Sequence, residues 1–144
     1  MMRVFIILAL LMAPLVLTFS ISTQGSQMSQ AVLTQIEVVP GSGDAITAGK
    51  TAVVHYTGWL YDEEAADHKG KKFDSSRDHG DTFAFRVGAG EVIKGWDQGV
   101  LGMKVGGQKQ LIIPADLGYG ARGAGGVIRG GATLIFDIEL IAIR

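Results

Sequence analysis

The sequence contains no cysteine and no asparagine. Without cysteine the chain has no disulfide framework, no thiolate ligand for a metal and no thiol nucleophile. Without asparagine it has no acceptor for N-linked glycosylation. Charge is also scarce, since 19% of the residues are charged and 13 basic residues face 14 acidic ones. Because no basic excess is available to hold a polyanion, we expect no binding to nucleic acid.

The length of 144 residues suits one domain, because domains usually have about 100 to 200 residues. Glycine is abundant, with 21 residues, but it is dispersed among apolar runs without a collagen-like period. This composition is typical of a compact fold with many turns.

Residues 1–30 differ from the rest of the chain. Arg3 is their only charge, residues 4–19 are almost entirely apolar, and residues 20–30 are small and polar. This order is typical of a secretory signal peptide, and the apolar run is shorter than the about 20 residues of a spanning helix. The small residues that follow form a poor cleavage site, so an uncleaved signal anchor in the inner membrane stays open as the alternative. Both interpretations place residues 31–144 outside the cytoplasm.

Strand patterns dominate the domain formed by residues 31–144. Alternation is clearest at the end of the chain, where Leu134 and every second residue to Ala142 are predicted to share one face of a strand, and Ile135 and every second residue to Ile143 the other. Runs bounded by turn residues predict further strands over residues 32–39, 51–60, 82–87 and 107–113.

Helical spacing occurs once, where Ile93, Trp96 and Val100 recur at i, i+3 and i+7 between two glycines. A short amphipathic helix of this kind is expected to lie across one face of a sheet, so that both surfaces form a single core. The predicted fold class is therefore α+β, a sheet with one short helix.

The sequence lacks the patterns of most cofactor sites. Residues 90–95 have the spacing of a phosphate loop, but Trp96 stands where a lysine should neutralise the phosphates. His55, His68 and His79 have no i, i+4 pair and no cysteine partners, so we expect no metal site. The sequence thus predicts no cofactor.

The patterns of hydrolytic chemistry are also weak. The pair Ser75 and Ser76 lies near a histidine in the sequence, but no nucleophile elbow surrounds it. The neighbouring acids Asp137 and Glu139 are predicted to lie on the outer face of a strand rather than in an acid–base pair. Proton-transfer and covalent catalysis are therefore not expected.

Aromatic residues are what the domain has in quantity. Taken singly, each is most simply a core residue, but several stand within five longer phrases. These are residues 53–58 (VVHYTG), 72–77 (KFDSSR), 92–96 (VIKGW), 117–120 (LGYG) and 132–137 (ATLIFD). In their order and spacing, the phrases resemble the FKBP-type peptidyl-prolyl cis-trans isomerases, and the resemblance covers residues 32–143.

The resemblance implies a curved antiparallel sheet wrapped around the short helix, with an apolar pocket between them. The catalytic residues that it implies are Trp96 as the floor, Tyr56 and Phe136 in the walls, and Asp74 and Tyr119 as a polar rim. The substrate-binding residues that it implies are the walls Phe73, Val92 and Ile93, Phe83 near the entrance, and the hydrophobic flap Val127 and Ile128. For Asp74, two roles stay open: orienting Tyr56, or capping the turn that follows it.

Three departures from the family pattern bear on this site. After the flap, Arg129 and Gly130 replace the two prolines of many members, which predicts a looser loop. His79 stands where eukaryotic members often carry an arginine able to pair with the pocket aspartate, which predicts that the orientation of Asp74 depends on pH. The long loop over residues 61–70 resembles that of bacterial members.

The resemblance, taken together with residues 1–30, implies an isomerase that accelerates folding of exported proteins in the periplasm or cell envelope. Its partners would be proline-containing polypeptides and macrolide inhibitors, and we expect a monomer that touches a membrane only through an uncleaved N-terminal segment. No nucleophile is needed, because an apolar pocket favours the less polar twisted amide over the planar one. The alternative is a peptide-binding module or holdase chaperone that uses the same cleft with little turnover.

Overall fold

The structure is a computed structural model that describes residues 32–144, so the predicted signal segment lies outside the described residues. The described part holds one α-helix, α2 (Lys94–Gly99), and two 3₁₀-helices, η1 (Ser76–Asp78) and η2 (Ala115–Leu117). None of these helices is long and apolar enough to cross a membrane. The strands are β1 (Thr34–Val39), β2 (Thr51–Tyr61), β3 (Lys69–Ser75), β4 (Phe83–Arg86), β5 (Gln108–Ile113) and β6 (Leu134–Ile143).

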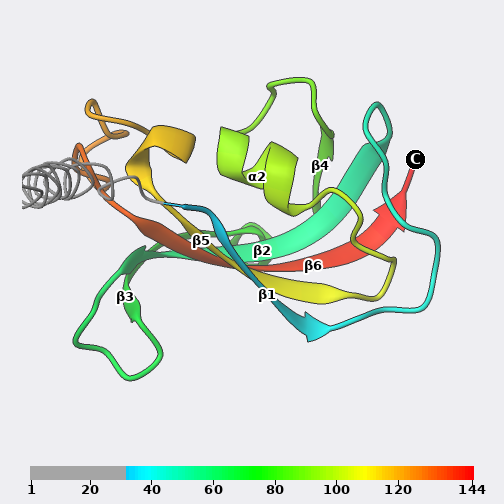
Figure 1. The fold of residues 1–144 in the computed structure, drawn as a ribbon, viewed down its shortest axis with the longest axis horizontal. Coiled ribbons are helices and arrows are strands. Elements are labelled where there is room, and N and C mark those ends of the chain that lie inside the picture. Colours follow the sequence, from blue (N-terminus) through cyan, green and yellow to red (C-terminus); the bar gives the residue numbers. More distant parts are fainter. Residues whose placement is uncertain (1–31) are drawn as a thin grey trace, which may run out of the picture. The chain divides into compact units, whose positions relative to one another are not determined.

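The strands form one antiparallel sheet in the order β1-β5-β6-β2-β3, with β4 paired to β2 as well. Helix α2 lies on one side of this sheet, and β2, β5 and β6 pass beneath it (Figure 1). An antiparallel sheet with one short helix confirms the predicted fold class. Strand β3 was not among the predicted strands, and its sequence KGKKFDS has no alternation to reveal it.

Strand β2 is the centre of the pairing. One of its edges pairs with β6 over residues 52–60. The other edge pairs first with β4, over residues 51–54, and then with β3 from Thr57 onward. His55 and Tyr56 therefore face a gap between two partner strands on that edge.

Strand β6 follows the predicted alternation as far as Leu140. The residues of one face are buried, and Asp137 and Glu139 lie on the other, as predicted. Beyond Leu140 the prediction is wrong, because the register with β2 shifts and leaves Ile141 as an extra residue. This β-bulge reverses the faces. As a result Ile143, rather than Ala142, packs against the core.

Helix α2 packs on the sheet through two glycines. A Cβ atom at Gly95 would meet the side chain of Ile113 at 2.6 to 2.9 Å, and one at Gly99 would meet Leu111 at 2.6 Å. Ile113 and Leu111 belong to β5 and are fully buried. Trp96 is buried as the predicted helical face requires. The close approach of helix and sheet thus depends on residues that lack a side chain.

Replacing Gly95 by alanine tests this packing. We expect Gly95→Ala to lower the free energy of unfolding by about 1–3 kcal/mol, because the added methyl group overpacks the interface. This loss would occur although alanine is about 1 kcal/mol better than glycine inside a helix. Urea unfolding measures the effect, with Gln98→Ala on the exposed side of the same helix as the control. Equal stability of the two variants would contradict the close packing.

Candidate functional site

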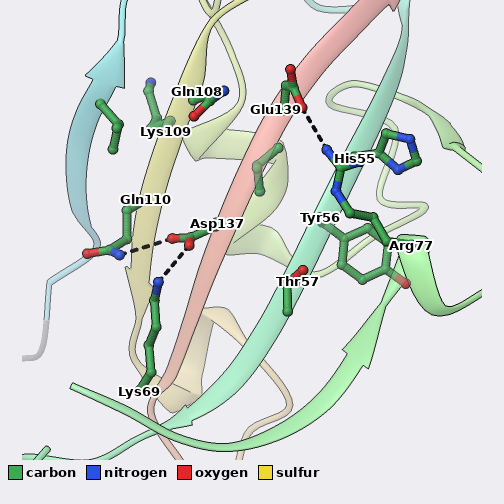
Figure 2. A pocket seen from close by; sticks show the side chains of 12 residues that line it. His55, Tyr56, Thr57, Lys69, Arg77, Gln108, Lys109, Gln110, Asp137 and Glu139 are labelled. Carbon is green, nitrogen blue, oxygen red and sulfur yellow. Dashed lines mark hydrogen bonds and ion pairs between the residues drawn. The ribbon is translucent and has the colours of Figure 1, made fainter. Parts of the chain in front are cut away.

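One cavity lies on the face of the sheet away from α2 (Figure 2). It has a volume of about 400 Å³ and is lined mainly by polar side chains. Four of its charged side chains are paired: Lys69 lies 2.7 Å from Asp137, and Arg77 lies 2.9 Å from Glu139. The fifth, Lys109, bonds instead to the Gln35 side chain and to the Gly99 carbonyl. Most charges of this outer groove are therefore already engaged within the protein.

A second cavity lies between α2 and the sheet and has a volume of about 190 Å³. Its walls come from strands β2, β3, β4 and β6, from α2 and the residues before it, and from the segment after η2. The lining residues are Tyr56, Phe73, Asp74, Phe83, Glu91, Val92, Ile93, Trp96, Tyr119 and Phe136. An aromatic cleft with a few polar groups at one side is typical of a binding site for an apolar ligand.

Trp96 lies at the centre of the aromatic cluster and is only 4% exposed. Its ring stands edge to face with Tyr56 and with Phe136, at centroid distances of 5.0 and 5.3 Å. Phe73 meets Phe136 in the same way at 5.5 Å. Such contacts suit the charge distribution of aromatic rings and hold each ring in one orientation. The walls of the cavity are therefore fixed by ring-to-ring packing.

Gly58 makes room for two of these rings. A Cβ atom at this position of β2 would lie 2.6 Å from Phe136 and 2.8 Å from Phe73. Both rings can thus pack against the bare backbone of the sheet.

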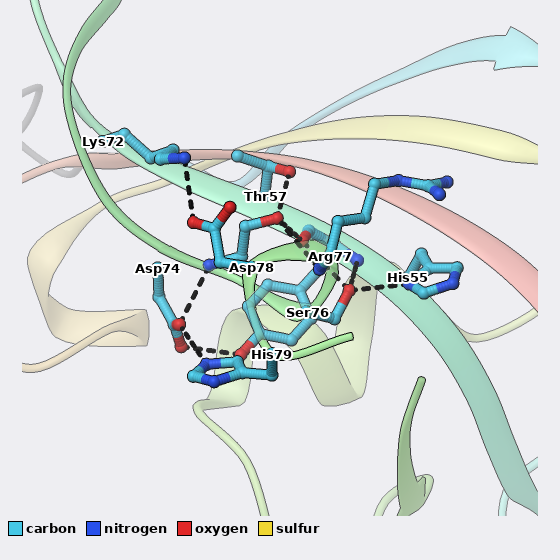
Figure 3. A network of polar contacts seen from close by, with 10 residues as sticks. His55, Thr57, Lys72, Asp74, Ser76, Arg77, Asp78 and His79 are labelled. Atoms are coloured by element: carbon cyan, nitrogen blue, oxygen red, sulfur yellow. Dashed lines mark hydrogen bonds and ion pairs between the residues drawn. The ribbon is translucent and has the colours of Figure 1, made fainter. Parts of the chain in front are cut away.

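The polar rim is built around Asp74. The Tyr56 hydroxyl donates a hydrogen bond of 2.6 Å to one carboxylate oxygen of Asp74. The other oxygen accepts the Ser75 N–H at 2.9 Å and lies 2.9 Å from Nε2 of His79 (Figure 3). Asp74 thus holds the Tyr56 hydroxyl, whereas the turn that follows is capped by Ser75, whose Oγ accepts the Arg77 N–H at 3.2 Å. His79 occupies the pairing position that the resemblance implied.

These contacts shift the proton equilibria of the rim. Burial tends to raise the pKa of Asp74, but the hydrogen bonds from Tyr56, His79 and the Ser75 N–H lower it below its ordinary value. Burial raises the pKa of Tyr56, and the hydrogen bond and negative charge of Asp74 raise it further. Burial and Asp74 also raise the pKa of Tyr119. The rim therefore holds one carboxylate and two neutral phenols at neutral pH.

The structure brings together all the predicted site residues except the flap. Val127 is 44% exposed and Ile128 is buried in the core, and neither lines the cavity. Their role in binding stays a prediction. Sequence reasoning missed Glu91, which lines the cavity and accepts the Arg86 N–H at 2.9 Å. Its place directly before the phrase VIKGW was the only signal that could have indicated it.

The flap loop is held by its own backbone. Ala124 and Ile128 exchange two hydrogen bonds of 2.9 and 3.1 Å, and the Gly131 N–H donates to the Gly120 carbonyl at 2.9 Å. A Cβ atom at Gly130 would collide with the carbonyl oxygen of Ala121. Glycine at position 130 is therefore required by the close backbone approach.

Comparison with known proteins agrees with this site. Residues 43–141 match the family of FKBP-type peptidyl-prolyl cis-trans isomerases. The chain is 52% identical over 103 residues to an FK506-binding protein of Neisseria meningitidis serogroup A, and this match covers 72% of this chain and 88% of that protein. It is 56% identical over 97 residues to FK506-binding protein 2B of Rhizopus delemar, which covers 67% of this chain but only 44% of the fungal protein.

A solved structure, that of AtFKBP13, superposes with a TM-score of 0.67 at 39% identity and covers 78% of this chain and 93% of that one. An antiparallel sheet with a short helix across it and an aromatic pocket between them defines one class of small α+β protein. Within that class, the chain belongs to the FKBP-type peptidyl-prolyl cis-trans isomerase family.

The lowered pKa of Asp74 predicts how acid affects stability. A carboxylate whose pKa falls on folding stabilises the protein above its ordinary value of 3.8, and this stabilisation is lost as the pH falls through the folded pKa. We therefore expect Asp74→Asn to be less stable than the wild type at pH 6, with the difference shrinking as the pH falls below 3.8. Urea unfolding from pH 3 to 7 measures it.

The control for this experiment is Asp116→Asn, at an exposed position in η2. We expect it to leave the pH dependence of the unfolding free energy close to that of the wild type. A stability difference for Asp74→Asn that does not change with pH would show that the carboxylate charge is not what the rim hydrogen bonds stabilise.

Proposed function

We propose that this protein accelerates the cis–trans isomerisation of X-Pro bonds in polypeptides, and that the reaction occurs in the aromatic cavity beside α2. The observation that carries the proposal is the cavity itself: Trp96, Tyr56 and Phe136 form an aromatic surface that is bordered by a polar rim. Membership of the isomerase family supports the same activity.

The isomerisation needs only an apolar environment and a group that holds the substrate in place. Rotation about a peptide bond costs about 18–20 kcal/mol because partial double bonding is lost, and X-Pro bonds isomerise in tens to hundreds of seconds without help. The planar amide is more polar than the twisted one, so transfer from water to an aromatic cavity favours the twisted form. No bond breaks, so the site needs no nucleophile.

The polar rim supplies the hydrogen-bond donor that holds the substrate. The Tyr119 hydroxyl lies at the edge of the cavity, and its raised pKa keeps it a hydrogen-bond donor. Such a donor holds a substrate carbonyl by positioning rather than by transferring a proton. The Tyr56 hydroxyl already donates to Asp74, so Tyr56 contributes mainly its ring and a fixed wall.

The proposal is tested by the isomerisation of a Leu-Pro tetrapeptide. We expect the protein to accelerate it, and FK506, the ligand in the names of its relatives, to block it. Phe136→Ala should lower kcat/KM by at least about tenfold, which corresponds to about 1.4 kcal/mol of transition-state stabilisation. Tyr119→Phe should lower it less.

The matched control is Leu140→Ala, because Leu140 is fully buried on the same strand but does not line the cavity. Both alanine variants lose core contacts, so an equal loss of activity would show that stability, and not the pocket, sets the rate. A folded wild-type protein that does not accelerate the reaction would leave a peptide-binding module or holdase chaperone as the function.

We also propose that the protein works outside the cytoplasm, as a monomer acting on proline-containing exported proteins. The support is the sequence of residues 1–30, with its single Arg3 charge and long apolar run. Alkaline phosphatase fused to the full chain should be active in a bacterial host, because the enzyme needs the oxidising compartment. A fusion that begins at residue 31 should be inactive. Equal activities would refute export, and the mass of the mature protein separates cleavage from anchoring.

A further inference from the structure

Two buried serines join the end of β3 to the middle of β2. Ser75 and Ser76 are only 3% and 2% exposed, and they are the buried polar residues of the described part of the chain. A buried hydroxyl is costly unless it is hydrogen-bonded. The contacts of these two hydroxyls therefore show what they hold in place.

Both hydroxyls bond to the backbone of Tyr56. Ser76 Oγ accepts the Tyr56 N–H at 2.9 Å, and Ser75 Oγ donates to the Tyr56 carbonyl at 3.0 Å. Tyr56 lies at the gap between β4 and β3, where the edge of β2 has no partner strand. The two side chains thus take the place of the missing strand at this one residue.

The same segment carries the rim carboxylate. Asp74 precedes the two serines and accepts the Tyr56 hydroxyl at 2.6 Å. Tyr56 is therefore tied to residues 74–76 twice, by its backbone through the serines and by its side chain through Asp74. Any shift of the serine bonds moves the phenol and the carboxylate relative to each other.

His55 bonds to this arrangement from the opposite face of the sheet. Its Nδ1 lies 2.9 Å from Ser76 Oγ, and its ring lines the outer groove (Figures 2 and 3). The Ser76 hydroxyl has one proton and a second acceptor, the Tyr56 carbonyl, at 3.3 Å. A bare Nδ1 accepts that proton, whereas the tautomer that carries its proton on Nδ1 donates to Oγ and leaves the Ser76 proton to the Tyr56 carbonyl. Whether Nδ1 of His55 carries a proton therefore sets the direction of its hydrogen bond with Ser76 Oγ.

Charged groups surround His55 in the outer groove. Glu139 is its direct partner on β6 and is paired with Arg77 of η1. The remaining charged residues that line the groove are Lys69 of β3, Lys109 of β5 and Asp137 of β6.

We propose that His55 and Ser76 are positioning residues, which set the placement of Tyr56 and Asp74 at the rim of the aromatic cavity from the other face of the sheet. The role in catalysis rests on the proposed isomerase function. The positioning itself rests on the contacts of Ser76 Oγ with Tyr56 and His55, and it can be observed without any turnover.

The test compares His55→Asn with His55→Leu. The two substituents have nearly the same size, but only asparagine offers a hydrogen-bond acceptor near the place of Nδ1. Proton NMR follows the Tyr56 hydroxyl, whose short bond to Asp74 should give a signal far downfield. We expect this signal to move or broaden in His55→Leu and in Ser76→Ala, and to keep its wild-type position in His55→Asn.

Kinetics of the Leu-Pro tetrapeptide give the second readout. We expect kcat to fall about 3- to 30-fold in His55→Leu with little change in KM, because small misplacements of a site residue are costly to the reaction. His55→Asn should stay within about twofold of the wild type by the same reasoning. Asparagine is the poorer strand residue, so an effect on stability alone would give the opposite order.

The outcomes separate the two proposals. A Tyr56 signal and a kcat that are unchanged in folded His55→Leu would overturn the positioning role. A wild-type protein without isomerase activity, but with a Tyr56 signal that responds to His55→Leu, would overturn the isomerase function and keep the positioning. If Ser76→Ala does not fold, the His55 pair alone decides, because its side chain lines an open groove.

Discussion

The structure depends on an interruption in the strand pairing along β2. β4 and β3 cover the two ends of one edge and leave the peptide of Tyr56 between them. Side-chain hydroxyls bond to the N–H and to the carbonyl of Tyr56 in place of a strand. The chain after β3 can therefore turn into η1 instead of continuing as a strand. The turn brings Asp74 to the Tyr56 hydroxyl and places His79 beside the carboxylate. The polar rim of the cavity is thus a consequence of an imperfect sheet.

Much of the fold was predictable because it follows hydrophobic periodicity. The alternation of β6 predicted its buried face up to Leu140, and the spacing of Trp96 and Val100 predicted the helix. Two features were not predictable in this way. The bulge at Ile141 arises from the register between two strands, which no single segment encodes. Strand β3 has a charged sequence without alternation, and it is a strand because β2 offers it an edge.

The site was predictable only through its resemblance to a family. Each aromatic residue of the cavity, read alone, is an ordinary core residue, and only the order of the five phrases distinguished the wall residues from others such as Phe85. The contacts of Ser76 and His55 were not predictable at all, because they join residues 21 positions apart through the face of a sheet. Glu91 was missed because it lies directly before the phrase VIKGW and not within it.

The shape of the loop over residues 120–131 requires glycine at positions where a side chain would not fit. A Cβ atom at Gly123 or Gly130 would strike the carbonyl oxygen of Ile128 or Ala121. Backbone hydrogen bonds and the burial of Ile128 in the core constrain the loop further. The exposed positions of the loop, such as Arg122 and Arg129, contribute little to its form. Substitutions that change the charge or size of these two side chains are therefore expected to leave the outline of the loop unchanged.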